Sequence, residues 1–181
     1  MREERTNTAM HRLHLLRHAK SSRDDSVEDR ERRLSRRGRD DARAVGRTLP
    51  LALGGLDLVL CSSALRTRET AELALADVAS HPEILFEDGL YLAGPAALLR
   101  RLTALDEIAG SVLLIGHNPG LHELALSLAL PEGKAYRALA QGKFPTTVRA
   151  SFAIESPWSQ LGKARHRLTD YVTVKSLDAE G

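Results

Sequence analysis

The stretch SVLLIGHNPGLHELALSLAL, residues 111–130, contains the pattern from which the fold can be argued. Residues 111–116 are almost continuously apolar, which is typical of a strand covered on both faces of its sheet. A turn follows, and the residues after it predict a helix that Pro131 and Gly133 end. A buried strand that leads directly into a helix is the repeating unit of an α/β protein with a parallel sheet.

The same unit recurs in the residues before this stretch. Short apolar runs predict strands at 12–17, 56–60 and 83–87. A helix is predicted at 35–49, with Ser35 as its N-cap and with Pro50 and Gly54-Gly55 at its end. A second helix, capped by a serine, follows the 56–60 strand, and a third runs over 95–105 with Pro95 in its first turn.

The C-terminal part of the chain has a different period. Residues 148–155 and 165–175 alternate between apolar and polar side chains, which favours two half-buried, antiparallel strands. We therefore predict an α/β fold, a three-layer α/β/α sandwich whose central sheet is largely parallel with an antiparallel edge. We expect a frayed leader over residues 1–11 and a single domain over residues 12–181.

Composition narrows the functional classes. A net charge of +2 is too small to suggest a nucleic-acid or membrane surface, so we expect neither partner. The single cysteine, Cys61, excludes an internal disulfide and is typical of a reducing compartment. The N-terminus has no apolar stretch of signal-peptide length and no segment approaches the ~20 apolar residues of a membrane span, so we expect a cytoplasmic protein.

Polar side chains follow three of the predicted strands where each strand ends. Arg17 and His18 end the first strand, Arg66 lies in the first turn of the helix after the second, and His117 and Asn118 follow the fourth. In such sheets ligands bind beyond the carboxyl ends of the strands, so we expect these residues to share one crevice. Guanidinium groups and helix N-termini bind phosphate oxygens, which predicts an anion site.

A histidine inside an anion site suggests covalent phosphoryl transfer. His18 would attack phosphorus as a neutral imidazole, with its other ring nitrogen held by a backbone carbonyl. Arg17, Arg66 and His117 would stabilise the charge on the transferred phosphoryl group. Together with Asn118, these three are also the candidate substrate-binding residues.

Four segments occur in the order and with the spacings of a known family: LLRHAKSS (15–22), LSRRG (34–38), LVLCSSALRTRETA (58–71) and LLIGHNPG (113–120). Over residues 12–155 the chain resembles the histidine phosphatase superfamily, which is phosphoglycerate mutase-like, and within it the small SixA-type phosphohistidine phosphatases. The resemblance implies that His18 is phosphorylated during turnover and that Arg17, Arg66 and His117 bind phosphate. It implies no metal and no organic cofactor.

The chain departs from the family pattern at Leu92. Ester-hydrolysing relatives carry an acidic proton donor where this chain has Leu92, with Asp88 and Asp24 as the other carboxylates that could reach the site. An alkoxide leaving group needs a proton, whereas phosphohistidine releases an imidazole of pKa about 6.5, a far better leaving group. The departure therefore favours a phosphoramidate or another activated phosphate over an aliphatic phosphate ester, and we predict phosphohistidine on a protein as the substrate.

Three other functions fit parts of the pattern. The chain could be a broad-specificity phosphatase of small phosphate esters, or a non-catalytic module that binds phosphate with the same arginines. A metal site could use His11, His14 and His18, or His117 and His122. Strand alternation places His11 on the face opposite to His14 and His18, and no carboxylate or cysteine completes the set, so we expect no metal site.

Overall fold

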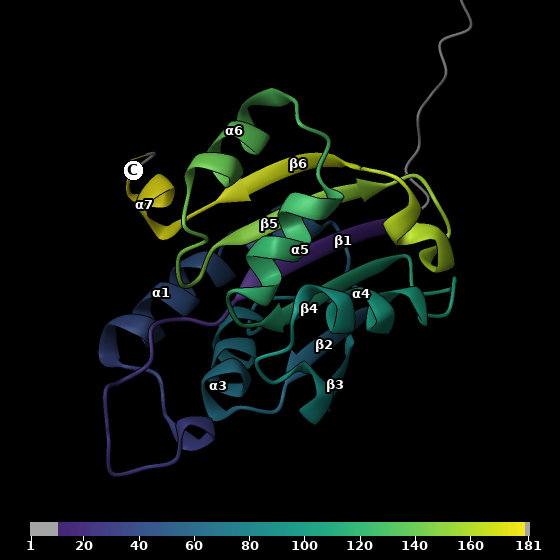
Figure 1. Ribbon diagram of the computed structural model, residues 1–181. Coiled ribbons are helices and arrows are strands. Elements are labelled where there is room, and N and C mark those ends of the chain that lie inside the picture. Colours follow the sequence, from purple (N-terminus) through teal and green to yellow (C-terminus); the bar gives the residue numbers. More distant parts are fainter. Residues whose placement is uncertain (1–10, 180–181) are drawn as a thin grey trace, which may run out of the picture.

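The computed structural model describes residues 11–179, and these residues form one six-stranded sheet with helices on both faces (Figure 1). The sheet order is β3-β2-β4-β1-β5-β6. The strands are β1 (His11–Arg17), β2 (Leu58–Ser62), β3 (Glu83–Glu87), β4 (Ser111–Gly116), β5 (Arg149–Ile154) and β6 (Arg167–Val172).

Four neighbouring strands pair in parallel, and the two pairings made by β5 are antiparallel. β1 pairs in parallel with β4, β4 with β2, and β2 with β3, while β5 pairs antiparallel with both β1 and β6. The prediction of a largely parallel sheet with an antiparallel edge is confirmed. The carboxyl ends of β2, β4 and β1 are neighbours, so their following residues meet at one edge.

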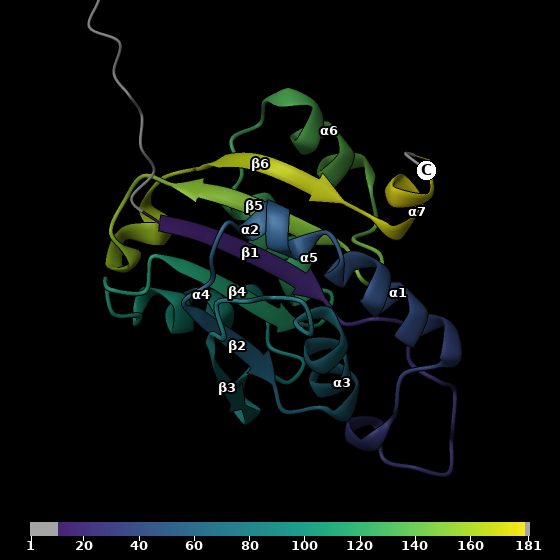
Figure 2. The same ribbon diagram turned by 180° about the vertical axis from the view of Figure 1, so that it is seen from behind.

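The helices divide between the two faces of the sheet (Figures 1 and 2). One face carries α4 (Pro95–Thr103), α5 (Gly120–Leu128) and α6 (Gly133–Gln141). The other carries α1 (Arg36–Gly46), α2 (Leu49–Leu53), α3 (Leu65–Ala74) and α7 (Val174–Asp178). Each layer encloses its own apolar cluster, in which Leu13 and Leu15 of β1 face the first layer and Leu16 faces the second. Alternation along β1 thus holds the strand in place from both sides.

Several predicted boundaries were wrong. The helix predicted at 35–49 is two helices, because the chain turns at Arg47 and Thr48, and Pro50 lies in the first turn of α2 instead of ending a helix. Proline is compatible with a first helical turn, where its missing N–H would have had no partner. Gly54 ends α2 in the left-handed conformation.

Of the two helix caps predicted from serines, one is confirmed and the other is wrong. Ser35 caps α1 by accepting a hydrogen bond from the amide of Gly38, as predicted. The serine cap expected before α3 is absent, because Ala64 occupies the N-cap position without a side-chain bond. The second strand begins two residues later than predicted, and α6 and α7 were not predicted.

The predicted leader lies outside the described residues except for His11, which is the first residue of β1. Over the part of the chain that the structure describes, none of the helices has the length and apolar character needed to cross a bilayer.

Candidate active site

A polar pocket of about 290 Å³ lies beyond the carboxyl ends of β1, β2 and β4. Its lining residues are Arg17, His18, Lys20, Ser21, Arg23, Arg32, Arg66, Leu92, His117, Asn118 and Thr146. All five of the site residues predicted from the sequence are among them. The crevice expected at these strand ends therefore exists, and it is lined by cationic side chains.

The His18 ring is oriented by the backbone of the next residue. Its Nδ1 lies 2.7 Å from the carbonyl oxygen of Ala19, so Nδ1 carries the proton and donates it. Burial, and then the charges of Arg66 and Arg17, lower the pKa of His18 to about 4. At neutral pH the imidazole is uncharged and its Nε2 carries a lone pair, which is the state that a nucleophile requires.

His117 faces His18 across the pocket, with 5.3 Å between the ring centroids. Its Nε2 lies 2.7 Å from Ser62 Oγ, and its Nδ1 lies 3.4 Å from an Arg66 nitrogen. Because arginine can only donate, Nδ1 accepts and Nε2–H donates to the serine. Burial, then His18 and Arg66, lower the pKa of His117 to about 3.

Arg66 is almost completely buried and is held by Asp29. Its Nη1 donates to the Asp29 carbonyl oxygen at 2.7 Å, and its Nη2 donates to Asp29 Oδ2 at 3.0 Å. The hydroxyl of Tyr91 donates to the same carboxylate oxygen, and the Tyr91 ring packs edge-on against His117. Asp29 and Tyr91 thus fix the guanidinium in the pocket wall.

Arg17 and Asn118 are tied to the segment that precedes β5. Arg17 Nη1 donates to the carbonyl oxygen of Phe144 at 3.0 Å, and its buried Nε has no partner within residues 11–179. The Asn118 amide nitrogen donates to the carbonyl oxygens of Phe144 and Lys143 at 2.9 and 3.2 Å. The side-chain amide of Asn118 therefore positions this segment, with both of its hydrogens directed at the backbone.

Two positions in the sequence motifs, Gly38 and Gly120, must be glycine because the backbone of another segment lies against them. A Cβ on Gly38 would lie 2.0 Å from the carbonyl oxygen of Lys20, so only glycine lets α1 approach the residues after His18. A Cβ on Gly120 would lie 1.9 Å from the carbonyl oxygen of Ala93. This second contact holds the segment that contains Leu92 against α5, at the edge of the pocket.

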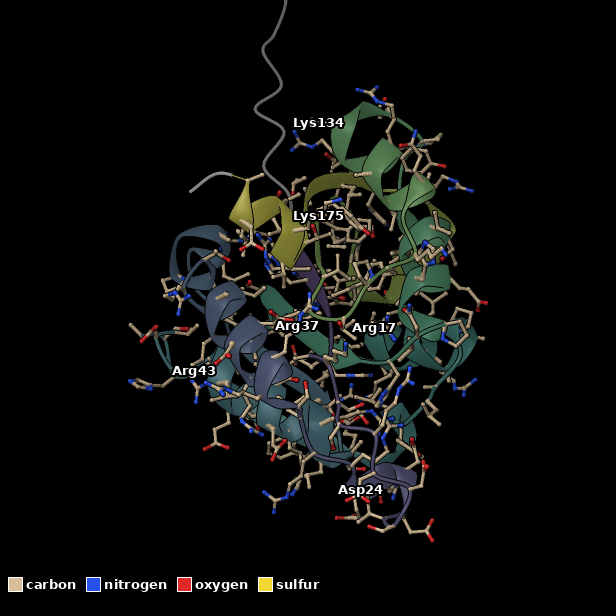
Figure 3. All side chains as sticks on the ribbon, turned by 90° about the vertical axis from the view of Figure 1, so that its left-hand side faces the viewer. Arg17, Asp24, Arg37, Arg43, Lys134 and Lys175 are labelled. Carbon is tan, nitrogen blue, oxygen red and sulfur yellow. The ribbon has the colours of Figure 1, made fainter. Side chains whose placement is uncertain are left out.

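Leu92 lines the pocket, whereas neither carboxylate suspected from the sequence does. Asp88 accepts a hydrogen bond from Ser63 and pairs with Arg30. Among the described residues the Asp24 carboxylate bonds only to Ser26, and it lies in a loop far from Arg17 (Figure 3). The pocket is therefore bordered by the apolar side chain of Leu92, and none of its lining residues is a carboxylate.

Asp29, the carboxylate that contacts Arg66, was not identified from the sequence. The hydrogen bond from Tyr91, followed by the charge of Arg66, lowers the pKa of Asp29, so it is ionised and has no proton to give. Asp29 lies in a polar segment without hydrophobic periodicity, 37 residues before its partner Arg66. A local pattern carries no signal for such a pair.

The histidines considered for a metal site are not assembled into one. Within residues 11–179 no three histidine, cysteine, aspartate or glutamate side chains are grouped as metal ligands. His11 pairs with Glu107 and stacks on Trp158, and His14 bonds to Ser151 on the sheet.

Acidification should destabilise the fold through the buried histidines. The pKa values of His14, His18 and His117 are about 3, about 4 and about 3, against 6.5 for an ordinary histidine. Between about pH 6.5 and 4 the unfolded chain therefore binds more protons than the folded one, and stability falls as pH falls. We expect the urea midpoint to drop from pH 7 to pH 5, with a smaller drop in His117→Asn; equal pH slopes for the two proteins would contradict this assignment.

This chain is similar to a known protein family and to several known proteins. The family model described as "Histidine phosphatase superfamily (branch 1)" matches residues 13–90. An uncharacterized protein of Mycobacterium tuberculosis is 31% identical over 148 residues, covering 81% of this chain and 91% of the relative.

Two solved structures have a similar fold and related sequences. The first is a protein from Nakamurella multipartitia provisionally named phosphohistidine phosphatase SixA, with a TM-score of 0.79, 27% identity, and coverage of 90% of this chain and 95% of that one. The second, with the same provisional name, is from Agrobacterium tumefaciens and has a TM-score of 0.75, 27% identity, and coverage of 90% and 97%.

Proposed function

This chain belongs to the histidine phosphatase superfamily, in its SixA-type branch, and from that membership we propose that it removes the phosphoryl group from phosphohistidine on a protein through a covalent intermediate on His18. The superfamily match supports a phosphatase, and the chemistry of the pocket supports this substrate. The proposed enzyme needs no metal ion.

The proposed reaction has two displacements. In the first, the substrate ring takes a proton from water on its free nitrogen, Nε2 of His18 attacks phosphorus, and the bond from phosphorus to that ring breaks so that a neutral imidazole leaves. In the second, water attacks the phosphorylated His18, inorganic phosphate leaves, and the neutral imidazole is regenerated. The Nδ1–H of His18 stays bonded to Ala19 throughout, which keeps Nε2 directed at the pocket.

Charge stabilisation would come from Arg17, Arg66 and His117. Both guanidinium groups are fixed by other contacts before any phosphate arrives, so little reorganisation is needed during the reaction. The low pKa of His117 arises from burial and cationic neighbours. A phosphate dianion in the pocket would raise it again, so that His117 could hold a second proton and donate it to a phosphoryl oxygen.

Leu92 is the observation that carries the substrate assignment. It borders the pocket with no carboxylate among the lining residues, and the nearby Asp29 is ionised and engaged with Arg66 and Tyr91. A general acid contributes about 10²–10⁴-fold to a step that expels a poor leaving group. Without one, a leaving group that departs unassisted is strongly favoured.

A panel of substrates with graded leaving-group pKa tests this proposal. We expect kcat/KM for phosphohistidine and aryl phosphates to exceed that for phosphoserine and sugar phosphates by ~10². A flat dependence at chemistry-limited rates would contradict the substrate assignment and favour a broad phosphatase of small esters. Leu92→Glu should raise activity on alkyl esters, whereas the uncharged control Leu92→Gln should not.

A further inference from the structure

The pocket holds more positive charge than one phosphoryl group needs. Five cationic side chains line it, and two of them, Arg17 and Arg66, flank His18 as the proposed phosphate ligands. The other three, Lys20, Arg23 and Arg32, come from the segment that follows His18. No carboxylate is among the lining residues, although Asp29, beside the pocket, pairs with both Arg66 and Arg32.

The pocket is also larger than a phosphoryl group. A volume of about 290 Å³ is close to the lower end of pockets that enclose whole small molecules. When a phosphoryl group occupies the space between His18, Arg66 and His117, the remainder of the pocket lies beside the three additional cations. The part of the substrate that is attached to the phosphoryl group would therefore lie against these three positively charged side chains.

The segment that carries these cations is held in place by its own contacts. Ser22 donates its amide to the carbonyl oxygen of Arg33 at 2.8 Å, and Ser21 forms a β-bridge with Leu34. Leu34 in turn donates its amide to Glu69 of α3 at 2.7 Å. The three cations are thus presented by an anchored backbone, which lowers the entropy cost of binding a ligand there.

The three cations differ in how far their own contacts occupy them. Arg32 is fixed by Asp29 and by the backbone oxygen of Ser22, which orients its guanidinium. Arg23 is exposed and forms no ion pair with any residue of the described chain. Lys20 is also exposed and forms no ion pair there, although its charge acts on the carboxylate of Asp41. Arg23 and Lys20 are therefore available to an anionic ligand.

We propose that Lys20, Arg23 and Arg32 form a second anion subsite, which binds a second anionic group of the substrate beside the scissile phosphoryl group. This inference rests on the proposed phosphatase function and narrows its substrate class. The second group is an oxyanion, either the carboxylate of an acidic residue close to the phosphohistidine or a second phosphate of a small molecule. Because these guanidinium and ammonium groups would contact the substrate beside the phosphoryl group that reacts, we expect them to affect substrate choice and the association rate.

Two measurements test the subsite. The first is kcat/KM for a phosphohistidine peptide with Asp and Glu neighbours against the same peptide with Asn and Gln. The second is the dissociation constant of inorganic diphosphate against inorganic phosphate, which needs no turnover. We expect the wild type to prefer the acidic peptide, the diphosphate or both by ~10-fold at low salt, and to lose much of the preference at high salt.

The double variant Lys20→Ala, Arg23→Ala should bring these ratios close to one. The matched control is Arg137→Ala, which removes an exposed cation from α6, away from the pocket, and should keep the wild-type ratios. A preference for the acidic peptide alone would identify a protein substrate, and a preference for diphosphate alone would identify a small molecule. Ratios in the double variant equal to those of the wild type would overturn the subsite.

The two measurements separate this inference from the function on which it rests. If phosphohistidine is hydrolysed with no discrimination and diphosphate binds no more tightly than phosphate, the subsite is wrong and the proposed function stands. If no phosphohistidine substrate is hydrolysed but the diphosphate preference exists and disappears in the double variant, the subsite stands and the proposed function is wrong.

Discussion

Replacing His18 with alanine should reduce turnover by ~10³-fold or more, because covalent catalysis has no second route of comparable speed once the nucleophile is removed. The fold should survive, since the only side-chain hydrogen bond of His18 within residues 11–179 is to the carbonyl oxygen of the adjacent Ala19. We would measure kcat with phosphohistidine and aryl phosphate substrates, together with the thermal midpoint of both proteins.

A matched histidine control separates the role of His18 from the loss of any imidazole. His81 is exposed, lies outside the pocket and has a φ of 45°, a conformation that asparagine accepts, so His81→Asn should keep wild-type turnover. Mass spectrometry after an acid-free quench should detect phosphate on His18 in the wild type. A His18→Ala protein that retains more than a few per cent of the wild-type rate would remove His18 as nucleophile.

A wild type in which no phosphorylated His18 can be trapped and no substrate is turned over would favour the non-catalytic binding module. The same arginines would then bind phosphate and release it unchanged. Phosphate binding by itself therefore does not distinguish the two functions, whereas a trapped intermediate does.

The second large effect is expected at Arg66, where alanine should lower kcat by ~10³. Loss of one preorganised charge-stabilising donor typically costs about 10²–10³, and Arg66 is a buried cation whose guanidinium reaches both Asp29 and His117. Arg66→Lys should recover only part of the rate, because a lysine keeps the charge but cannot reproduce the fork of donors. Single-turnover kinetics would report the chemical step directly.

Arg66 also contacts Asp29, so a structural effect must be separated from a chemical one. Asp29→Asn weakens the same contact from the other side while leaving the arginine in the pocket. If Arg66→Ala lowers the thermal midpoint to the same extent as Asp29→Asn and leaves the rate of the chemical step unchanged, Arg66 is a structural residue and the proposed mechanism loses a phosphate ligand.

The residues of the candidate site were accessible to sequence reasoning because each one stands at the end of a recognisable strand. The apolar runs of β1, β2 and β4 predict that His18, Arg66 and His117 lie at one edge of the sheet. Parallel strands align their carboxyl ends, so a one-dimensional pattern was enough to predict a three-dimensional convergence. The same reasoning predicted that a carbonyl would hold the second nitrogen of His18, and Ala19 does so.

Boundaries were less predictable, because helix ends depend on competition between neighbouring segments. The break at Arg47 and Thr48 divides a stretch that reads as one continuous amphipathic helix. In the structure Leu49 and Leu53 of α2 pack into the same apolar cluster as Val45 of α1, so burial of both segments decides where the chain turns. Tertiary packing of this kind overrides local preference.

The sequence by itself determined the α/β class, the order of the motifs and the strand ends at which Arg17, His18, Arg66 and His117 gather, because hydrophobic periodicity and turn residues are local properties. Only the tertiary structure decided that Asp29 and Tyr91 hold Arg66. It also decided that the Asn118 amide bonds to the backbone of residues 143–144. The convergence of three further cations on the same pocket, Lys20, Arg23 and Arg32, was likewise decided by the tertiary structure. These contacts join segments up to 62 residues apart, as in the bond from Tyr91 to Asp29. Their partners are selected by how the layers pack, and no periodicity within one segment encodes that choice.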